Sequence, residues 1–208
     1  MISQPTVILV DDDEAVRDAL GRSLRLAGLV VDAYASGHEF LAAYRPDRPG
    51  CLLMDLRMPG LDGLEVQKAL AERHISIPVI FMSGSGSIRD SVEAIKGGAV
   101  DFLEKPFSRT LLLERIHEAL ARDSELRKRR QQDEGIRARC ASLTPREKEI
   151  LGLIAAGNTA KETAKALGIS PRTVEHHRAQ LLYKLQASSL TELGVLASIC
   201  LGWEELPH

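Results

Sequence analysis

Short apolar runs alternate with amphipathic segments through the first 120 residues of the chain. The runs lie at 6–10, 29–35, 51–55, 79–83 and 100–104. Several of them are apolar at consecutive positions, which is typical of strands buried on both faces of a parallel sheet. Segments with helical spacing lie between and after them, near 14–27, 37–44, 63–73, 87–97 and 108–120. Five strands that alternate with helices predict an α/β domain with a doubly wound, five-stranded parallel sheet.

The rest of the chain is predicted to be helical. The segment 121–139 is almost entirely polar, and we interpret it as a solvated extension of the fifth helix, a linker, or both. The capping box "TPRE" begins a helix at 144–156, and "LGISPRTV" ends a second helix and begins a third at Pro171. A helix, a short turn with glycine and a second helix are typical of a helix-turn-helix motif.

A fourth helix is expected at 189–201, so that the C-terminal part is an all-α domain of four helices. We therefore expect three parts, at 1–122, 123–141 and 142–208: an α/β domain, a helical or polar linker, and the all-α domain. Acidic residues outnumber basic ones in 1–122, whereas basic residues outnumber acidic ones in 141–203. This difference suggests two modules with different partners.

The cysteines and the chain ends bear on the compartment. Cys51, Cys140 and Cys200 are odd in number and lack metal-ligand spacing, so we expect a reducing compartment and no disulfide framework. The N-terminus lacks the features of a signal peptide, and the uncharged run at 193–203 is too short to span a bilayer. We therefore expect a cytoplasmic protein without a membrane partner.

Charged and hydroxyl side chains follow four of the five predicted strands. They are Asp11, Asp12 and Asp13 after the first, Asp55 on the third, Ser83 on the fourth and Lys105 after the fifth. Because the carboxyl ends of parallel strands share one edge of the sheet, these groups are expected to converge there. Crowded carboxylates need a cation, and oxygen ligands favour Mg²⁺. An aspartate in such a site can attack phosphorus while Lys105 and the metal neutralise the phosphoryl group.

For each single aspartate the alternative is a turn or a helix cap, and we expect Asp13 to be a cap. Taken together, however, the motifs "VDDD", "MDLRMPGLDG", "MSG" and "EKPF" resemble the receiver domain of bacterial response regulators over about residues 5–122. The resemblance implies a CheY/flavodoxin-like fold and phosphorylation of Asp55. It also implies Mg²⁺ bound by Asp12, Asp55 and the backbone carbonyl of Arg57, with Asp11 acting through water.

The same resemblance assigns roles to three residues near the carboxyl ends of the last two strands. It implies that Ser83 is the switch hydroxyl and that Lys105 binds the phosphoryl group, with a cis peptide bond before Pro106. Phe102 stands at the switch aromatic position, and a core aromatic is its alternative role. Because phenylalanine lacks a hydroxyl, any switch at this residue is steric.

The sequence from 142 to 203 resembles the LuxR-type DNA-binding domain, and with the receiver the whole chain resembles a FixJ-type response regulator. In the helix 171–185, Glu175, His176 and Ala179 are expected to meet base edges. Phosphate contacts are expected from Lys161, Arg172, Thr173, Arg178 and Lys184. His177 is assigned to packing or to a phosphate contact. The alternative is a solvated face of an ordinary helical bundle.

We therefore expect a transcription factor that a sensor histidine kinase phosphorylates at Asp55. Phosphorylation would favour a homodimer that binds double-stranded promoter DNA, and RNA polymerase is a further expected partner. An aspartyl-phosphate hydrolase is the alternative among enzymes, but Arg57 stands where such enzymes carry a second acid, so no enzyme is expected. A dinucleotide-binding enzyme is excluded because no glycine-rich turn follows the first strand. A protein-binding adaptor remains an alternative.

Overall fold

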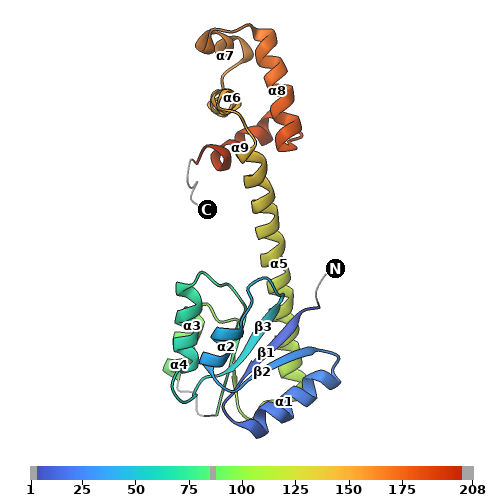
Figure 1. The fold of residues 1–208 in the computed structure, drawn as a ribbon, viewed down its shortest axis with the longest axis vertical. Coiled ribbons are helices and arrows are strands. Elements are labelled where there is room, and N and C mark those ends of the chain that lie inside the picture. Colours follow the sequence, from blue (N-terminus) through green and yellow to red (C-terminus); the bar gives the residue numbers. More distant parts are fainter. Residues whose placement is uncertain (1–3, 85–87, 203–208) are drawn as a thin grey trace. The chain divides into compact units, whose positions relative to one another are not determined.

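The computed structural model describes residues 4–84 and 88–202, which form two compact units that divide after Arg127. The first unit contains one five-stranded sheet with the order β2-β1-β3-β4-β5, in which all neighbours are parallel (Figure 1). Its strands are β1 (Thr6–Val10), β2 (Val30–Tyr34), β3 (Gly50–Asp55), β4 (Val79–Ser83) and β5 (Asp101–Glu104). The predicted doubly wound α/β fold is confirmed.

Helices cover both faces of this sheet. They are α1 (Glu14–Leu26), α2 (Gly37–Ala43), α3 (Gly63–Glu72), α4 (Ile88–Lys96) and α5 (Arg109–Ala141). One apolar cluster joins the sheet to α2, α3 and α4 through Phe40, Val66 and Ala94. A second cluster joins the opposite face to α1 and α5 through Leu24 and Ile116. Strands β1, β3 and β4 are buried at every position, which explains their consecutive apolar residues.

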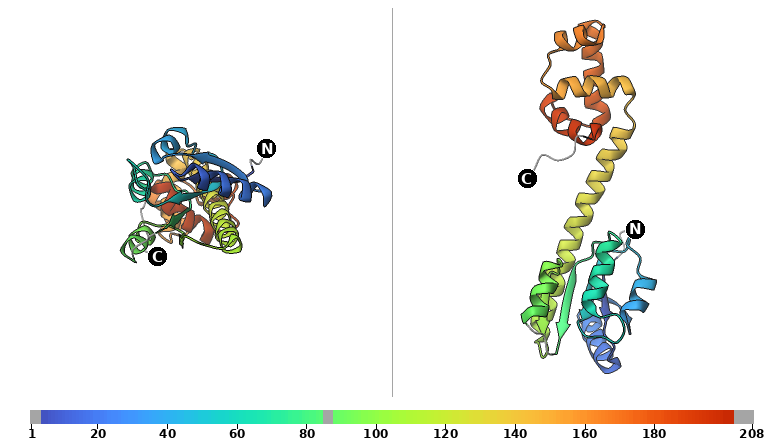
Figure 2. Two further views of the ribbon diagram at one scale, coloured as in Figure 1. Left: turned by 90° about the horizontal axis from the view of Figure 1, so that it is seen from below. Right: turned by 90° about the vertical axis from the view of Figure 1, so that its left-hand side faces the viewer.

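Helix α5 is a single helix of 33 residues, drawn in yellow-green to yellow in Figure 2. The polar segment after 120 is therefore helical. It is not wholly solvated, because Asp123 is buried and accepts a hydrogen bond from the backbone N–H of Gly50 at 2.8 Å. Arg127 pairs with Asp123 at 2.7 Å and donates to the backbone carbonyl of Asp47. These contacts extend the first compact unit to Arg127, past the expected boundary at 122.

The second unit contains the end of α5 and four further helices. They are α6 (Pro145–Ala155), α7 (Ala160–Leu167), α8 (Pro171–Leu185) and α9 (Leu190–Leu201). The predicted capping box at Thr144 is present, and Ser170 caps α8 by accepting from the Thr173 N–H at 3.1 Å. Gly168 ends α7 with φ 65°, a left-handed conformation that glycine adopts without strain. Residue 87 of the helix predicted at 87–97 and residues 203–208 of the domain predicted at 142–208 lie outside the described residues.

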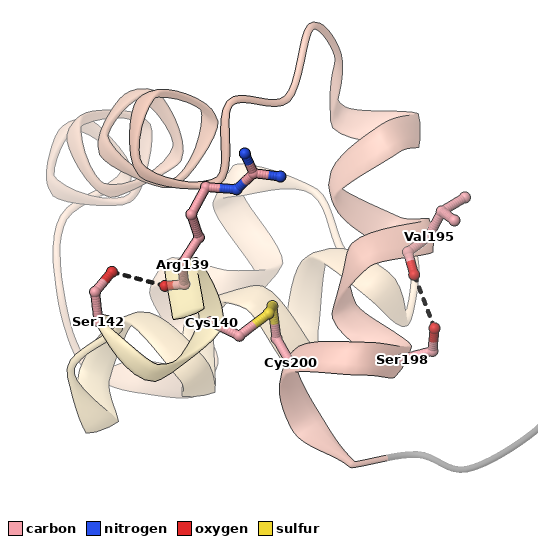
Figure 3. Close-up of a disulfide and its surroundings, with 6 residues drawn as sticks. All are labelled: Arg139, Cys140, Ser142, Val195, Ser198 and Cys200. Atoms are coloured by element: carbon pink, nitrogen blue, oxygen red, sulfur yellow. Dashed lines mark hydrogen bonds between the residues drawn. A yellow bond between two sulfur atoms is a disulfide. The ribbon is translucent and has the colours of Figure 1, made fainter. Parts of the chain in front are cut away.

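A disulfide joins Cys140 to Cys200 in the second unit (Figure 3), so the expectation that the chain has no disulfide is wrong for this pair. The two cysteines are 60 residues apart in sequence. They meet because the ends of α5 and α9 pack into one apolar cluster, and no local spacing encodes that contact. Cys51 is free and buried in the sheet. No helix among the described residues has the length and apolarity that a membrane crossing requires.

Candidate functional site

Two buried aspartates lie at the carboxyl ends of β1 and β3. The strand order reverses between these two strands, which is where open α/β sheets form their binding crevice. Asp11 directly follows β1 and Asp55 is the last residue of β3, and their exposed fractions are 1% and 7%. Buried carboxylates are costly unless they are paired. The site must therefore contain groups that compensate the charges of these two carboxylates.

Lys105 compensates both aspartates. Its Nζ lies 2.6 Å from Asp55 Oδ1 and 2.9 Å from Asp11 Oδ2. Burial by itself lowers the pKa of Lys105, but the hydrogen bonds that its amine donates to Asp55 and Asp11 outweigh burial, so that the pKa lies above its usual value. The amine is thus held in the charged form. The peptide bond between Lys105 and Pro106 is cis, which confirms that expectation.

The remaining oxygens of the two carboxylates accept backbone hydrogen bonds. Asp55 Oδ2 accepts from the N–H of Arg57 at 2.8 Å, and Asp11 Oδ1 accepts from the N–H of Asp13 at 3.0 Å. Asp13 caps α1 by accepting from Ala15 and Val16, as predicted. Both buried acids are therefore fixed in orientation by the loops that follow their strands.

Asp12, the residue after Asp11, is exposed and borders an open pocket together with Arg57 and Met58. Within the described residues, no three His, Cys, Asp or Glu side chains form a ready-made metal site. Lys105 instead takes the position of a cation between Asp11 and Asp55. The donor set of Asp11, Asp12 and Asp55 consists of hard oxygens, which is the chemistry that Mg²⁺ prefers.

Ser83 lies on β4, the strand next to β3, and Phe102 lies on β5, the edge strand beyond β4. Ser83 is the last residue of β4, at the same edge of the sheet as Asp55, and is 1% exposed. Lys105 donates its backbone N–H to the carbonyl of Ser83 at 2.7 Å, which connects the segment after β5 to the end of β4. Phe102 is half-buried on β5 and packs against the cluster under α2, α3 and α4. That packing supports its alternative role as a core aromatic.

Sequence reasoning missed an ion pair at the mouth of this site. The side chain of Arg57 donates to Asp90 on α4 with Nη2 and Oδ2 2.6 Å apart. The side chain of Arg57 is 62% exposed, whereas that of Asp90 is 14% exposed. The two residues lie 33 positions apart, so no local pattern could have joined them.

The solvent face of α8 carries the side chains expected at DNA bases. Glu175, His176 and Ala179 are exposed there. Among the residues expected at phosphates, Arg172 on α8 and Lys161 on α7 are exposed, whereas Thr173 is half-buried and its hydroxyl bonds that of Ser170 at 2.8 Å. His177 is half-buried, and its Nδ1 has no hydrogen-bond partner.

Two cations of α8 are paired inside the second unit. Arg178 bonds Glu175 at 3.0 Å and the carbonyl of Asn158 at 3.1 Å. Lys184 lies 2.8 Å from Glu147, a carboxylate that is 3% exposed at the start of α6. Burial by itself raises the pKa of Glu147, but hydrogen bonds from Lys184 and Thr144 outweigh it and hold the pKa below its usual value.

Comparison with known proteins matches both units to families. The family of response regulator receiver domains matches residues 7–117, and the luxR family of bacterial regulatory proteins matches 141–197. The transcriptional regulatory protein FixJ of Bradyrhizobium diazoefficiens is 40% identical over 95% of this chain and 96% of its own. The chain belongs to the FixJ-type response regulators. FixJ of Rhizobium meliloti is 42% identical over 92% of this chain and 94% of its own.

Solved structures of response regulators share the fold of this FixJ-type chain. The response regulator StyR is 39% identical with a TM-score of 0.85, over 94% of this chain and 99% of StyR. Full-length FixJ from B. japonicum is 39% identical with a TM-score of 0.59, over 98% of this chain and all of its own. The protein is a two-component response regulator that combines a receiver with a LuxR-type DNA-binding domain.

Proposed function

We propose that Asp55 is the phosphoacceptor through which a sensor histidine kinase controls this regulator. The observation that carries the proposal is the shared contact of the Lys105 amine with Asp55 and Asp11, at 2.6 and 2.9 Å. In the transfer, an oxygen of the Asp55 carboxylate attacks phosphorus, a P–O bond forms and the P–N bond of the phosphohistidine breaks. Lys105 would neutralise charge on the phosphoryl oxygens, and Ser83, at the same edge of the sheet, would donate a hydrogen bond from its hydroxyl to one of them.

Asp11, Asp12, Asp55 and the backbone carbonyl of Arg57 are the groups that we propose for holding Mg²⁺. The ion supplies positive charge beside the phosphoryl oxygens. With two like-charged acids buried in one crevice, an added cation lowers their mutual repulsion. Asp11 is oriented by the Asp13 N–H and Asp55 by the Arg57 N–H, so backbone hydrogen bonds already fix the orientation of two of the acids that would hold the ion. Phe102 we propose as a steric reporter of the phosphorylated state.

We propose that the second unit binds promoter DNA through α8, with two copies on two half-sites. Glu175, His176 and Ala179 would meet base edges, because all three are exposed on one stretch of the helix. Lys161, Arg172 and Thr173 would contact phosphates. Arg178 and Lys184 are paired within the unit, so we propose that they hold α8 in place and contact phosphates only secondarily.

The proposal also covers partners and place. A phosphorylation-dependent homodimer fits a domain whose net basic charge is too small for tight binding by one copy. RNA polymerase is a proposed further partner, and the compartment that we propose is the cytoplasm. We propose no independent enzymatic activity, because Arg57 stands two positions after Asp55, where a hydrolase of the aspartyl-phosphate class carries its acid.

Intact mass spectrometry after incubation with acetyl phosphate tests the assignment. We expect a single phosphoryl adduct that requires Mg²⁺ in the wild type and in Asp18→Asn, a matched control at an exposed position of α1. Asp55→Asn should show no adduct. An adduct that persists in Asp55→Asn would refute the assignment. Phosphorylation without any gain in DNA binding would favour the adaptor, and continuous release of phosphate would favour the hydrolase.

A further inference from the structure

The disulfide between Cys140 and Cys200 lies at two helix ends in the second unit. Cys140 is the last residue but one of α5, and Cys200 is the last residue but one of α9. Their Cα atoms are 4.8 Å apart, within the range that disulfides occupy. The bond closes a loop with a sequence separation of 60 that contains α6, α7 and α8. It therefore joins the two ends of the whole DNA-binding unit.

The surroundings of the two sulfurs are apolar. Cys140 and Cys200 are 6% and 9% exposed and belong to the cluster that contains Ile150, Leu193 and Ala197. The nearby hydroxyls of Ser142 and Ser198 donate to carbonyls of their own segments, at 2.6 and 2.8 Å (Figure 3). A reduced cysteine behaves as a small apolar side chain, so both thiols fit this cluster without an unsatisfied polar group. The unit can accordingly fold in either redox state.

The third cysteine does not compete for either partner. Cys51 is fully buried in the first unit, and its burial, with Asp123 nearby, raises the pKa of its thiol to about 12. A protonated, inaccessible thiol neither attacks a disulfide nor reacts with oxidants. Oxidation within the described part of the chain is thereby directed to one intramolecular pair.

We propose that Cys140 and Cys200 are a reversible oxidation site that cross-links the DNA-binding unit when the surroundings turn oxidising. The oxidant in this reaction is glutathione disulfide. A Cys thiolate attacks it to form a mixed disulfide and releases one glutathione, and the second Cys thiolate displaces the other. The two cysteines lose two electrons and two protons, and the oxidant becomes two glutathione thiols. Reduced glutathione reverses both steps.

The cross-link has a mechanical consequence for the unit. In the unfolded chain it restricts a long loop, which stabilises the folded state relative to the reduced form. We expect the melting temperature of the second unit to be higher in the oxidised protein by roughly 10 °C or more. The inference does not rest on phosphorylation of Asp55, because no residue of the first unit takes part in the pair.

Thiol counting in the full-length protein tests the site. The protein is equilibrated at graded ratios of reduced to oxidised glutathione, quenched in acid, labelled with N-ethylmaleimide in denaturant at neutral pH and weighed intact. We expect three labels under reducing conditions and one under oxidising conditions, since the chain has three cysteines. Cys140→Ser and Cys200→Ser cannot form the internal disulfide, so each should keep two labels under reducing conditions, and under oxidising conditions the remaining partner should carry either a label or a glutathione. Cys51→Ala should still lose two labels on oxidation.

Because a variant can fold poorly, the decisive comparison uses the wild type in its two redox states. In calorimetry, the melting temperature of the second unit should be higher in the oxidised than in the reduced protein, whereas that of the first unit should be the same in both. Three labels at every ratio, a stable glutathione adduct, a covalent dimer, or one label even in excess reduced glutathione would each overturn the proposal. Equal melting temperatures in the two states would overturn the cross-linking consequence.

Discussion

Arg57 and Asp90 form an ion pair with 2.6 Å between Nη2 and Oδ2, which connects the loop after β3 to the first turn of α4. The same loop residue donates its backbone N–H to Asp55 at 2.8 Å. Arg57 thus contacts the candidate phosphoacceptor through its main chain and α4 through its side chain. A change at Asp55 that moves this loop would act directly on the pair.

Removing the charge of Asp90 is expected to change the rate of phosphorylation. Asp90→Asn frees the exposed guanidinium of Arg57, which can then neutralise an incoming phosphoryl group. We expect the rate with acetyl phosphate to rise roughly two- to fivefold, the scale of an exposed ion pair. The rate is measured as the growth of the phosphoryl adduct in intact mass.

The matched control is an ion pair that joins α3 to α4. Lys68 and Glu93 lie 3.5 Å apart, and both side chains are largely exposed, so Glu93→Gln should leave the rate unchanged. The double variant Arg57→Gln with Asp90→Asn should behave like Arg57→Gln alone, because the guanidinium is then absent. Additive effects in the double variant would show that Asp90 acts by a route other than Arg57.

The buried carboxylate of Asp123 is expected to stabilise the receiver. Asp123→Ala leaves the N–H of Gly50 without its acceptor and removes the carboxylate that pairs with Arg127. We expect the free energy of unfolding of the first unit to fall by about 2–4 kcal/mol in urea titrations. Asp133→Ala, at an exposed position of the same helix, should change it by less than about 0.5 kcal/mol. Equal effects of the two substitutions would contradict the anchoring role of Asp123.

Stability of the DNA-binding unit should depend on the ionisation of Glu147. The folded-state pKa of this group lies below its unfolded value, so its contribution is present above the unfolded pKa of about 4.3 and is lost as the pH falls through the folded pKa. We expect Glu147→Gln to lower the free energy of unfolding of this unit by about 1.5–3 kcal/mol at pH 7. The difference from wild type should shrink below about pH 4. A difference that stays constant down to pH 3 would exclude the charge as its cause.

Arg172 and Lys184 are expected to differ in what their loss changes. Arg172→Ala removes an exposed cation at the start of α8, so DNA binding should weaken and the slope of log affinity against log salt should fall by about one. The melting temperature should remain that of the wild type. Lys184→Ala removes the partner of Glu147, so we expect it to lower the melting temperature of the second unit, whether or not it also weakens DNA binding. Fluorescence anisotropy at graded salt and calorimetry separate the two outcomes.

The sequence predicted the fold through its periodic features. The consecutive apolar residues of β1, β3 and β4 indicated buried parallel strands, and the capping box at Thr144 indicated the start of α6. The meeting of Asp11, Asp55 and Lys105 followed from the rule that parallel strands end at one edge. These features depend on local spacing and on topology, both of which can be read from one chain.

Polar contacts between distant segments could not be predicted in the same way. The partner of Asp123 is a backbone N–H at Gly50, which no side-chain pattern marks, so the segment after 120 was expected to be solvated. Lys184 and Glu147 lie 37 positions apart, and Cys140 and Cys200 lie 60 apart. Each pairing depends on how helices pack in three dimensions, and periodicity does not encode that packing.

The anchor at Asp123 has a practical consequence for engineered regulators. A chimera that joins this receiver to a foreign output module at 122 would remove both Asp123 and Arg127, and with them the acceptor for Gly50 at the start of β3. A fusion point after Arg127 keeps the donor, the acceptor and the guanidinium in one piece. The position of the fusion point in α5 therefore decides whether the transplanted receiver retains its own stability.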